Sequence, residues 1–544
     1  MARTTKLFAP QKPTAKATSK NREDYPAWNM PWDESLLQTL LTNTLGQVFY
    51  ASQKEMMDES KFVHEEALKQ DKAFYAKALV YARNEGYMRL QPVYGLARLA
   101  SESGPSDEFR QAFPGVIRTP DDLRDFSVIY KSMTGKHGAS KVKRAAGNWL
   151  ASRLSEYWAI KYGSEEKSGY SLRDMVQLYH PDTQDAKVKQ ILDYIMGSVE
   201  YDPGNLTDEL GGLVITRTWK DRHEHYPLSL EQLVAFEKLK RAKNQKDKIA
   251  AITAGRLPHE VATPFLGTSR ALWEAVGSQM PIFALLRHLA TLERHGALQG
   301  LRTVVEEKFT NPKIVLNSKI FPFEFLEAME KVSTGWALDA LRDAINISLG
   351  NIPELGSTAV LLDTSGSMRN RFLDIAKLFA VSLAMRSEAP LYAFDVHTYV
   401  CPISKRDSIL TQAQAIELGG NTGVHKQKVK DFVGRQAGTW TSGPLEVMIA
   451  NRQKVDCIVC ITDGQQNQGE PFADVLAKYR EQFNPQCQLF VLDVSPYLNA
   501  PVPEGRLNFR LAGWRDRALK FIALAKRGFG TLAQSIREER VAAE

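Results

Sequence analysis

The residues whose types and spacing are best suited to chemistry form an Asp-x-Ser-x-Ser turn. Asp363, Ser365 and Ser367 directly follow the apolar run 358–362, which is rich in branched side chains and typical of a buried parallel strand. The turn gathers one carboxylate and two hydroxyls at the carboxyl end of that strand, where open α/β sheets bind ligands. Such hard oxygen donors suit Mg²⁺, although a Gly/Ser turn with an incidental Asp has the same composition. The neighbouring loops therefore decide between these interpretations.

Two further loops carry matching oxygen donors. Asp463 follows the apolar run 455–461, and Thr439 lies in the loop 437–445, which leads into an expected helix. The stretch 419–422 is a rival for this middle loop, but the Pro-Leu that closes 437–445 favours the latter. Because the carboxyl ends of parallel strands share one sheet edge, the sequence predicts a metal site there. Its candidate ligands are Asp363, Ser365, Ser367, Thr439 and Asp463.

The elements that must position these loops alternate between strand and helix after about residue 356. This alternation favours an α/β domain with a doubly wound, mostly parallel sheet. The expected strands are 357–362, 390–394, 455–461 and 487–493, and the expected helices are 371–386, 444–452 and 471–482.

The preceding part of the chain has a different pattern. From about residue 33 to 349 the periodicity is helical, with almost no strand-like alternation, and Gly/Pro turns separate short helices. This pattern predicts stacked helical pairs without a strict repeat. Residues 1–22 hold six cations and no acid, so we expect a disordered basic arm there. We divide the chain into an arm at 1–25, a helical module at 26–352 and an α/β domain at 353–544.

The composition is that of a globular protein, with 43% hydrophobic and 24% charged residues among 544. No apolar run approaches the ~20 residues that span a bilayer, and the N-terminus has no apolar signal core, so we expect a cytoplasmic protein without a membrane partner. Cys457 and Cys460 point to opposite faces of an expected strand, which predicts buried thiols rather than a metal or redox pair. The net charge of +7 permits a polyanionic partner without requiring one.

Cations also gather on one expected helix of the helical module. Spacings of three and four residues bring such side chains together on a helix face, where they could neutralise phosphates. A solvated helix face has the same pattern, and the basic run 238–248 is better explained that way. The helix carries Lys141, Lys143, Arg144 and Arg153.

The three-loop constellation resembles the von Willebrand factor A domain and its metal-ion-dependent adhesion site. In that family the serines and the threonine coordinate Mg²⁺, the aspartates complete the shell directly or through water, and a partner carboxylate often takes the open position. This chain departs from the family at Trp440, where the middle loop commonly has Asp.

The helical half resembles the TROVE module of the Ro ribonucleoprotein family. The similarity lies in residues 141–149, 160–162 and 169–181, in a second block at 256–287, and in Phe321-Pro322-Phe323. The order of helical module and A domain is also that of the family, as in its bacterial members. The resemblance implies HEAT-like helical repeats bent into a ring that the A domain closes, and it places Lys161, Lys167 and His180 where the family contacts Y RNA.

The resemblance implies a non-enzymatic, monomeric protein that binds noncoding RNA rather than DNA. Small Y RNAs would bind its outer surface, and the single-stranded 3′ ends of misfolded RNAs its hole, for RNA quality control or processing. A 3′-exoribonuclease is an expected partner. No phosphate-binding Gly-rich loop, HExxH or nucleophile elbow occurs, in line with the absence of catalysis. The alternative is a cytosolic protein-interaction scaffold that uses an Mg²⁺-dependent A-domain site, and a metal-dependent ribonuclease is a third hypothesis.

Overall fold

The structure, a computed structural model, describes most of the chain. The described residues are 17–43, 52–86, 88–102, 106–163, 170–202, 212–219, 222–320, 322–352, 355–369, 371–418, 426–433, 438–494, 497, 499–503, 507–512 and 532–538. Contacts divide the chain into two compact units. One comprises Met1–Gln91, Phe321–Phe323 and Ser348–Ala542, and the other comprises Pro92–Ile320, Glu324–Ile347 and Ala543–Glu544. We call them the α/β unit and the helical unit.

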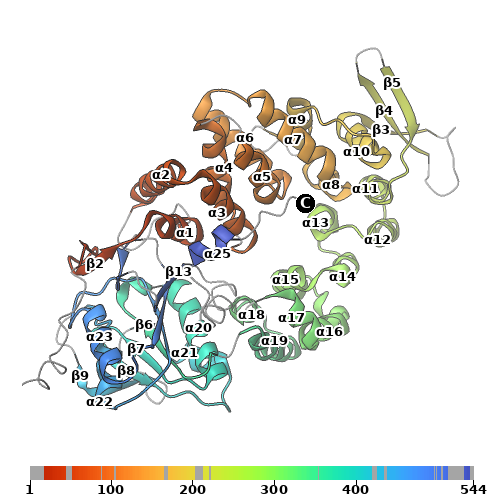
Figure 1. The fold of residues 1–544 in the computed structure, drawn as a ribbon. Coiled ribbons are helices and arrows are strands. Elements are labelled where there is room, and N and C mark those ends of the chain that lie inside the picture. The colour runs from red at the N-terminus through yellow and green to blue at the C-terminus, as the bar shows by residue number, and fades with distance from the viewer. Residues whose placement is uncertain are drawn as a thin grey trace, which may run out of the picture. The chain divides into compact units, whose positions relative to one another are not determined.

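The helical unit consists mainly of short amphipathic helices that succeed one another along the chain (Figure 1). Each buries an apolar stripe, because a helix with one apolar face is stable only when that face is packed. The helices are α4 (Leu90–Glu102), α5 (Asp107–Val116), α6 (Pro120–Thr134), α7 (Ser140–Arg153), α8 (Glu156–Tyr162), α9 (Leu172–Tyr179), α10 (Ala186–Met196), α11 (Glu231–Arg241), α12 (Gln245–Ala254), α13 (His259–Leu266), α14 (Arg270–Gln279), α15 (Ile282–Arg294), η1 (Leu298–Leu301), α16 (Arg302–Thr310), α17 (Pro312–Ser318), α18 (Pro322–Met329) and α19 (Gly335–Ser348).

Local sequence signals fix where the helices around α7 begin and end. Thr119 and Asp122 form a capping box at the start of α6, and Gly135 ends that helix with φ 69°. Within α7, Gly147 allows close contact with the end of α9, since a Cβ there would lie 2.7 Å from the carbonyl oxygen of Tyr179. This close approach joins α7 to α9.

The helical unit also contains a sheet that the sequence analysis missed. Strands β3 (Ser198–Tyr201), β4 (Leu213–Trp219) and β5 (Arg222–Pro227) form an antiparallel sheet in the order β3-β4-β5. The expectation of almost no strands before residue 349 was therefore wrong. Leu213, Val214 and Ile215 at the start of β4 are buried, whereas Thr218 of β4 and His225 of β5 are exposed.

The α/β unit is built on a seven-stranded sheet in the order β13-β11-β10-β6-β7-β8-β9. The pairs from β13 to β7 are parallel, and β8 and β9 join antiparallel. Figure 1 shows α20 on one side of the sheet and α22 and α23 on the other. The elements are β6 (Thr358–Asp363), η3 (Gly366–Met368), α20 (Arg371–Ser387), β7 (Leu391–Phe394), β8 (His397–Cys401), α21 (Ile409–Gln414), β9 (Gln427–Val433), α22 (Gly443–Ala450), β10 (Cys457–Thr462), α23 (Phe472–Gln482), β11 (Gln488–Asp493) and β13 (Asn508–Ala512), preceded by η2 (Leu349–Asn351).

The start of the chain belongs to the same unit. A small sheet pairs β2 (Pro26–Asn29) with β1 (Ser19–Lys20) and with β12 (Asn499–Ala500). Residues 1–16 of the expected disordered arm lie outside the described residues, but 17–25 are ordered by these strands and their turn, which corrects the expectation for that part. The unit also contains α1 (Trp32–Thr42), α2 (Gln53–Gln70), α3 (Lys72–Asn84) and α25 (Leu532–Glu538).

The fold class predicted from the sequence is confirmed: a helical half and an α/β half with a mostly parallel sheet. All four predicted strands occur, as β6, β7, β10 and β11, and all four cysteines are buried free thiols. None of the described helices combines the length and apolar character needed to cross a membrane. The ring shape and the domain boundaries stay predictions, although α1–α3 group here with the α/β half.

Candidate metal centre and nucleic-acid surface

The candidate metal centre lies at the carboxyl ends of two adjacent parallel strands. Strand β6 ends at Asp363, and β10 ends at Thr462, directly before Asp463. Asp363 is fully buried, and its two oxygens accept hydrogen bonds from the main-chain N–H of Ser365 (2.9 Å) and the hydroxyl of Thr462 (2.6 Å). The predicted turn and the predicted second strand therefore meet at one sheet edge.

The two serines lie at a spacing that suits a shared ion. Ser365 Oγ and Ser367 Oγ are 3.2 Å apart, and both side chains are buried. Adjacent ligands on an octahedron with metal–oxygen bonds of about 2.1 Å are about 3.0 Å apart. The hydroxyl pair therefore fits two neighbouring positions of an Mg²⁺ shell.

Asp463 supplies a buried carboxylate whose two oxygens differ in their hydrogen bonds with the described residues. Its Oδ1 accepts a hydrogen bond from the main-chain N–H of Gln465 (3.1 Å), whereas Oδ2 makes none with the described residues. Burial raises the pKa of Asp463, against the lowering effect of the nearby Ser367 hydroxyl. Burial, and the neighbouring charge of Asp463, raise the pKa of Asp363 as well. Two buried carboxylates of like charge are unfavourable when ionised, and a divalent cation would relieve that cost.

Thr439 is also buried, in a loop fastened to the one that carries Asp463. Its N–H donates to Asn467 Oδ1 (2.7 Å), and its carbonyl oxygen accepts from the N–H of Asn467 (3.1 Å). Trp440 stands where the related family commonly has Asp. Its indole Nε1–H donates a hydrogen bond to Glu446 Oε1 (3.1 Å). The rival stretch 419–422 lies outside the described residues.

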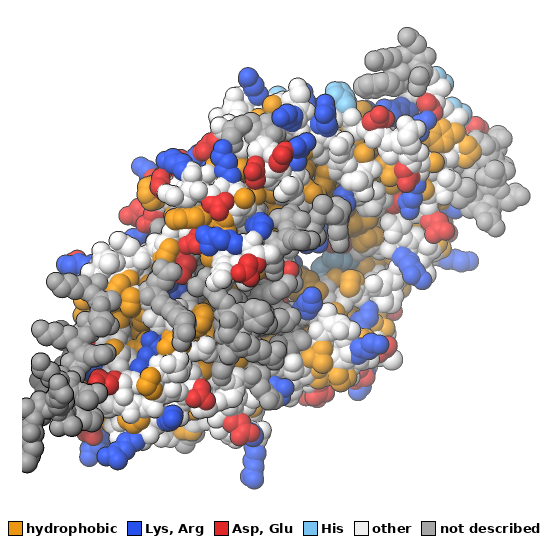
Figure 2. Space-filling view, viewed as in Figure 1, with side chains coloured by type: hydrophobic (Ala, Val, Ile, Leu, Met, Phe, Trp, Pro, Cys, Tyr) orange, Lys and Arg blue, Asp and Glu red, His pale blue; other side chains and the backbone are white. Residues whose placement is uncertain are grey.

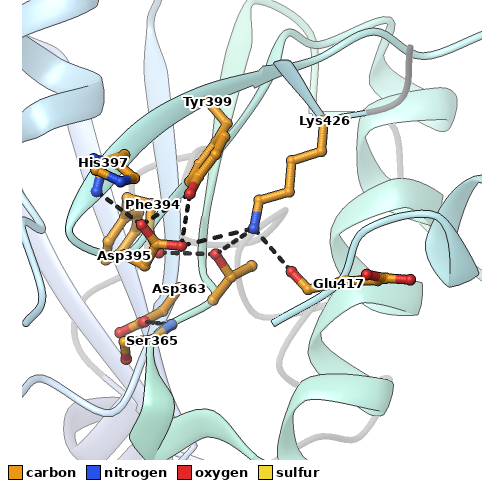
Figure 3. A network of polar contacts seen from close by, with 9 residues as sticks. Asp363, Ser365, Phe394, Asp395, His397, Tyr399, Glu417 and Lys426 are labelled. Atoms are coloured by element: carbon orange, nitrogen blue, oxygen red, sulfur yellow. Dashed lines mark hydrogen bonds and ion pairs between the residues drawn. The ribbon is translucent and has the colours of Figure 1, made fainter. Parts of the chain in front are cut away.

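A buried ion pair next to this centre was missed by the sequence analysis (Figure 3). The Lys426 ammonium lies 3.8 Å from Asp395 Oδ2 and donates to Thr364 Oγ1 (3.1 Å) and the carbonyl oxygen of Glu417 (2.8 Å). Asp395 also accepts hydrogen bonds from the Tyr399 hydroxyl. Lys426 precedes β9 and Asp395 follows β7, so no local spacing signalled the pair. Thr364 lies between the candidate ligands Asp363 and Ser365. The hydrogen bond from Lys426 to Thr364 therefore holds the turn that carries them.

The residues present fit Mg²⁺. All five candidate side chains offer hard oxygen atoms and all are buried, two are carboxylates, and Asp463 Oδ2 has no partner among the described residues. Asp363, Ser365, Ser367, Thr439 and Asp463 would hold the ion, whose charge the two carboxylates would balance.

The candidate nucleic-acid surface is a groove of about 610 Å³ between α5 and α7 in the helical unit, which we call the α5–α7 groove. Three of the predicted RNA-binding residues, Lys141, Arg144 and Arg153, line this groove, and they make no ion pair with the described residues. Arg110, from α5, lines it too and was missed, because nothing in the sequence brings α5 beside α7. Phe113 and Trp149 also line the groove.

Trp149 contributes both to this lining and to the core. Its ring stacks on Trp158 at 5.3 Å between centroids, and its side chain is largely buried. The Nε1 atom is itself buried and makes no hydrogen bond with the described residues. Trp149 therefore supplies ring surface to the groove.

The other predicted RNA contacts are distributed differently. Lys143 does not line the groove, because it lies about 200° around the helix from Lys141 at 100° per residue. Lys161, on α8, is held by Tyr157 and Glu260, and Lys167 lies outside the described residues. His180 is exposed at the end of α9 with φ 47°. The structure therefore brings together only three of the seven predicted residues.

The surface as a whole is not uniformly basic. On the face shown in Figure 2, Lys and Arg side chains are interspersed with Asp and Glu. This agrees with the mild net charge of +7 and makes the local arrangement of unpaired cations more informative than the total.

Comparisons with known proteins match part of the helical half by sequence and nearly the whole chain by fold. Residues 259–337 match the TROVE domain family. This match includes most of the second block of resemblance and all of the third, but not the segments between 141 and 181. The chain is 24% identical over 433 residues to "RNA-binding protein RO60" of Deinococcus radiodurans, covering 71% of this chain and 76% of that protein. The crystal structure of the Deinococcus radiodurans RO (RSR) protein has the same fold, with a TM-score of 0.63 and 20% identity, over 92% of this chain and all of that one. The resemblance to the bacterial type of Ro ribonucleoprotein family is therefore confirmed, by sequence in the TROVE segment and by fold over nearly the whole chain.

Proposed function

We propose that this protein binds structured RNA, with the α5–α7 groove as a phosphate-binding surface. The observation that carries the proposal is the convergence of Lys141, Arg144 and Arg153, unpaired with any described residue, around the partly aromatic lining of the groove. Such cations neutralise phosphates and release counterions, which gives salt-dependent affinity with little reading of sequence. The name of the Deinococcus relative, an RNA-binding protein, supports the same function.

The proposed ligands are Y RNAs and misfolded noncoding RNAs with single-stranded 3′ ends. Paired segments would be recognised by shape, and a single-stranded end by stacking on aromatic side chains. The protein would act without catalysis in RNA quality control or processing, with a 3′-exoribonuclease as a partner.

We also propose that Mg²⁺ binds Asp363, Ser365, Ser367, Thr439 and Asp463. Asp463 Oδ2 supports this site, since it is buried and makes no hydrogen bond within the described part of the chain. The same observation favours the second candidate function, a protein-interaction scaffold in which the ion captures a partner's carboxylate.

The test is a filter-binding salt series with a structured RNA that carries a free 3′ tail. K141A/R144A should lower the slope of log affinity against log salt by about 2, since each phosphate-contacting cation contributes about 1. K143A is the matched control, because Lys143 is on the same helix but does not line the groove, and it should change the slope less.

The outcomes separate the candidate functions. Equal effects of K141A/R144A and K143A would place the RNA surface elsewhere. A protein that ignores RNA at moderate ionic strength would favour the scaffold. Degradation of the RNA by pure protein with Mg²⁺ would favour a ribonuclease.

A further inference from the structure

Two exposed histidines lie side by side on the small antiparallel sheet of the helical unit, next to α10 (Figure 1). Their spacing of two residues would separate them by about 200° on a helix, the element expected for this part of the chain. The structure instead places His223 and His225 on β5, where alternate residues share one face at a separation of about 6.7 Å. Their rings are nearly parallel, at 7°, with centroids 6.5 Å apart. Both side chains therefore project from the same face of the sheet into solvent.

Threonine hydroxyls of the neighbouring strand hold both rings. The strand register pairs Thr216 with His225 and Thr218 with His223 across β4 and β5. Thr216 Oγ1 lies 3.0 Å from His225 Nδ1, and Thr218 Oγ1 lies 3.2 Å from His223 Nδ1. When Nδ1–H donates to the hydroxyl, the lone pair of the ring is on Nε2, where a metal ion can bind it. A hydrogen bond at the other ring nitrogen is the usual support of a metal-binding histidine.

A carboxylate lies close to one of these Nε2 atoms. Asp202 directly follows β3, and its Oδ2 is 3.7 Å from His225 Nε2. Two ligands of a tetrahedral Zn²⁺ ion with bonds of about 2.0–2.2 Å are about 3.4 Å apart. Asp202 and His225 are therefore within a few tenths of an ångström of the separation that a shared ion would impose.

The third ligand has to move to complete such a site. In the described part of the chain, no three side chains of His, Cys, Asp or Glu already surround a common metal position. The His223 ring must turn toward His225 for both Nε2 atoms to reach one ion. Its exposed position permits this rotation, and the longer of the two threonine hydrogen bonds, the one to Thr218, is the contact that yields.

We propose that His223, His225 and Asp202 form a binding site for a divalent transition-metal ion such as Zn²⁺, with water completing the coordination. Imidazole nitrogen suits such ions, whereas Mg²⁺ prefers ligand sets made of oxygen alone. The ion would join the end of β3 to β5 and so fasten the two outer strands of the sheet across β4. This inference does not rest on the proposed binding of RNA or Mg²⁺.

The alternative explanation is that the same contacts only stabilise the sheet. Cross-strand pairs of polar side chains have this effect in antiparallel sheets, and an ion pair between Asp202 and a protonated His225 gives the same short distance. The two explanations differ in their response to Zn²⁺, because only a metal site changes the sheet when the ion is added.

The first test titrates Zn²⁺ into the full-length protein by isothermal titration calorimetry, in a buffer with excess Mg²⁺. H225Q should lose one Zn²⁺-binding event of the wild type, because it removes a ligand. T216V keeps all three ligands and a β-branched side chain, and it should weaken the same event about 10–100-fold, the usual cost of losing an outer partner. E224Q is the matched control: Glu224 lies between the two histidines on the opposite face, 3.9 Å from Lys189, and its loss should leave the affinity unchanged.

The second test measures hydrogen exchange of the β3–β5 amides by mass spectrometry, with and without Zn²⁺. Zn²⁺ should slow exchange at least twofold in the wild type and in E224Q, and it should have no effect in H225Q. A purely structural histidine pair would change exchange equally with and without the ion.

Each outcome either supports or overturns the site. Loss of Zn²⁺ binding in H225Q, weaker binding in T216V and Zn²⁺-dependent protection of the sheet support it. Equal Zn²⁺ binding by H225Q and the wild type overturns it. Binding that is lost in H225Q but unchanged in T216V, without protection of the sheet, would be adventitious capture by surface histidines and would overturn it as well.

Discussion

Lys161 illustrates how the surroundings of one residue limit its availability to a ligand. Its ammonium donates to the Tyr157 hydroxyl (2.8 Å) and lies 3.6 Å from Glu260 Oε1, while Glu260 Oε2 lies 3.1 Å from His259 Nδ1. Burial alone would raise the pKa of Glu260, but its main-chain hydrogen bond, His259 and Lys161 together hold that pKa below its ordinary value. The ionised Glu260 therefore occupies the position near Lys161 that an RNA phosphate would need.

We expect E260Q to increase RNA affinity. Removing the competing charge frees the Lys161 ammonium for phosphate, and a partly exposed ion pair is worth about 0.2–1 kcal/mol, which allows up to about a fivefold gain. Filter binding at constant ionic strength measures the change. E306Q removes the same charge from the exposed pair with Arg302 and serves as the control. An equal gain in both variants would show a general charge effect and leave Lys161 without a role.

Single residues also show what could be predicted of the sites from sequence. Asp363, Ser365 and Asp463 were predictable because each follows the end of an apolar strand-like run. Arg110 and Lys426 were not, since each becomes important only through the packing of elements distant in the chain.

At the scale of elements, a buried ion pair connects the antiparallel edge of the sheet to the metal loop. Lys426 is fully buried at the start of β9, and Asp395 is buried at the turn between β7 and β8. The Lys426 ammonium also lies 4.1 Å from the centre of the Tyr399 ring on β8. A buried charge without its partner is costly, so these three strands depend on both members of the pair.

K426M should therefore destabilise the α/β unit by about 3–5 kcal/mol, because it leaves the Asp395 charge buried and unpaired. The double variant K426M/D395N should recover part of the loss, since it removes that charge as well. Urea denaturation followed by near-ultraviolet circular dichroism measures both effects. The control K405M breaks the exposed pair with Glu388 and should cost less than about 1 kcal/mol. A loss no larger in K426M than in K405M would contradict the argument.

The elements themselves were predictable to different degrees. Strands β6 and β10 are buried on both faces and form continuous apolar runs, so periodicity and composition identified them. Among the described residues of this sheet only the first three of β4 are buried, and Thr, His and Arg recur along β4 and β5, which concealed these strands in a helical context. Strands β8 and β9 escaped as well, because polar residues interrupt the apolar pattern of both, and β9 also lies at the edge of the sheet.

At the scale of the whole molecule, the two candidate sites belong to different compact units. Arg110 and α7 line the α5–α7 groove in the helical unit, whereas the candidate metal residues belong to the α/β unit. None of the described residues that line the groove is bonded to a candidate metal ligand. We therefore expect the two proposed sites to bind their ligands independently.

We accordingly expect D363N to abolish Mg²⁺ binding while leaving RNA affinity within about twofold of the wild type, since sites without shared partners couple by less than about 0.5 kcal/mol. The measurement is a parallel pair of titrations, Mg²⁺ by calorimetry and tailed RNA by filter binding. Ionic strength is matched between buffers with Mg²⁺ and with EDTA, because Mg²⁺ itself screens phosphates. K141A/R144A provides the reverse case, with weakened RNA binding and normal Mg²⁺ affinity. A large loss of RNA affinity in D363N, with unchanged thermal unfolding, would mean that the metal site and the RNA surface act together.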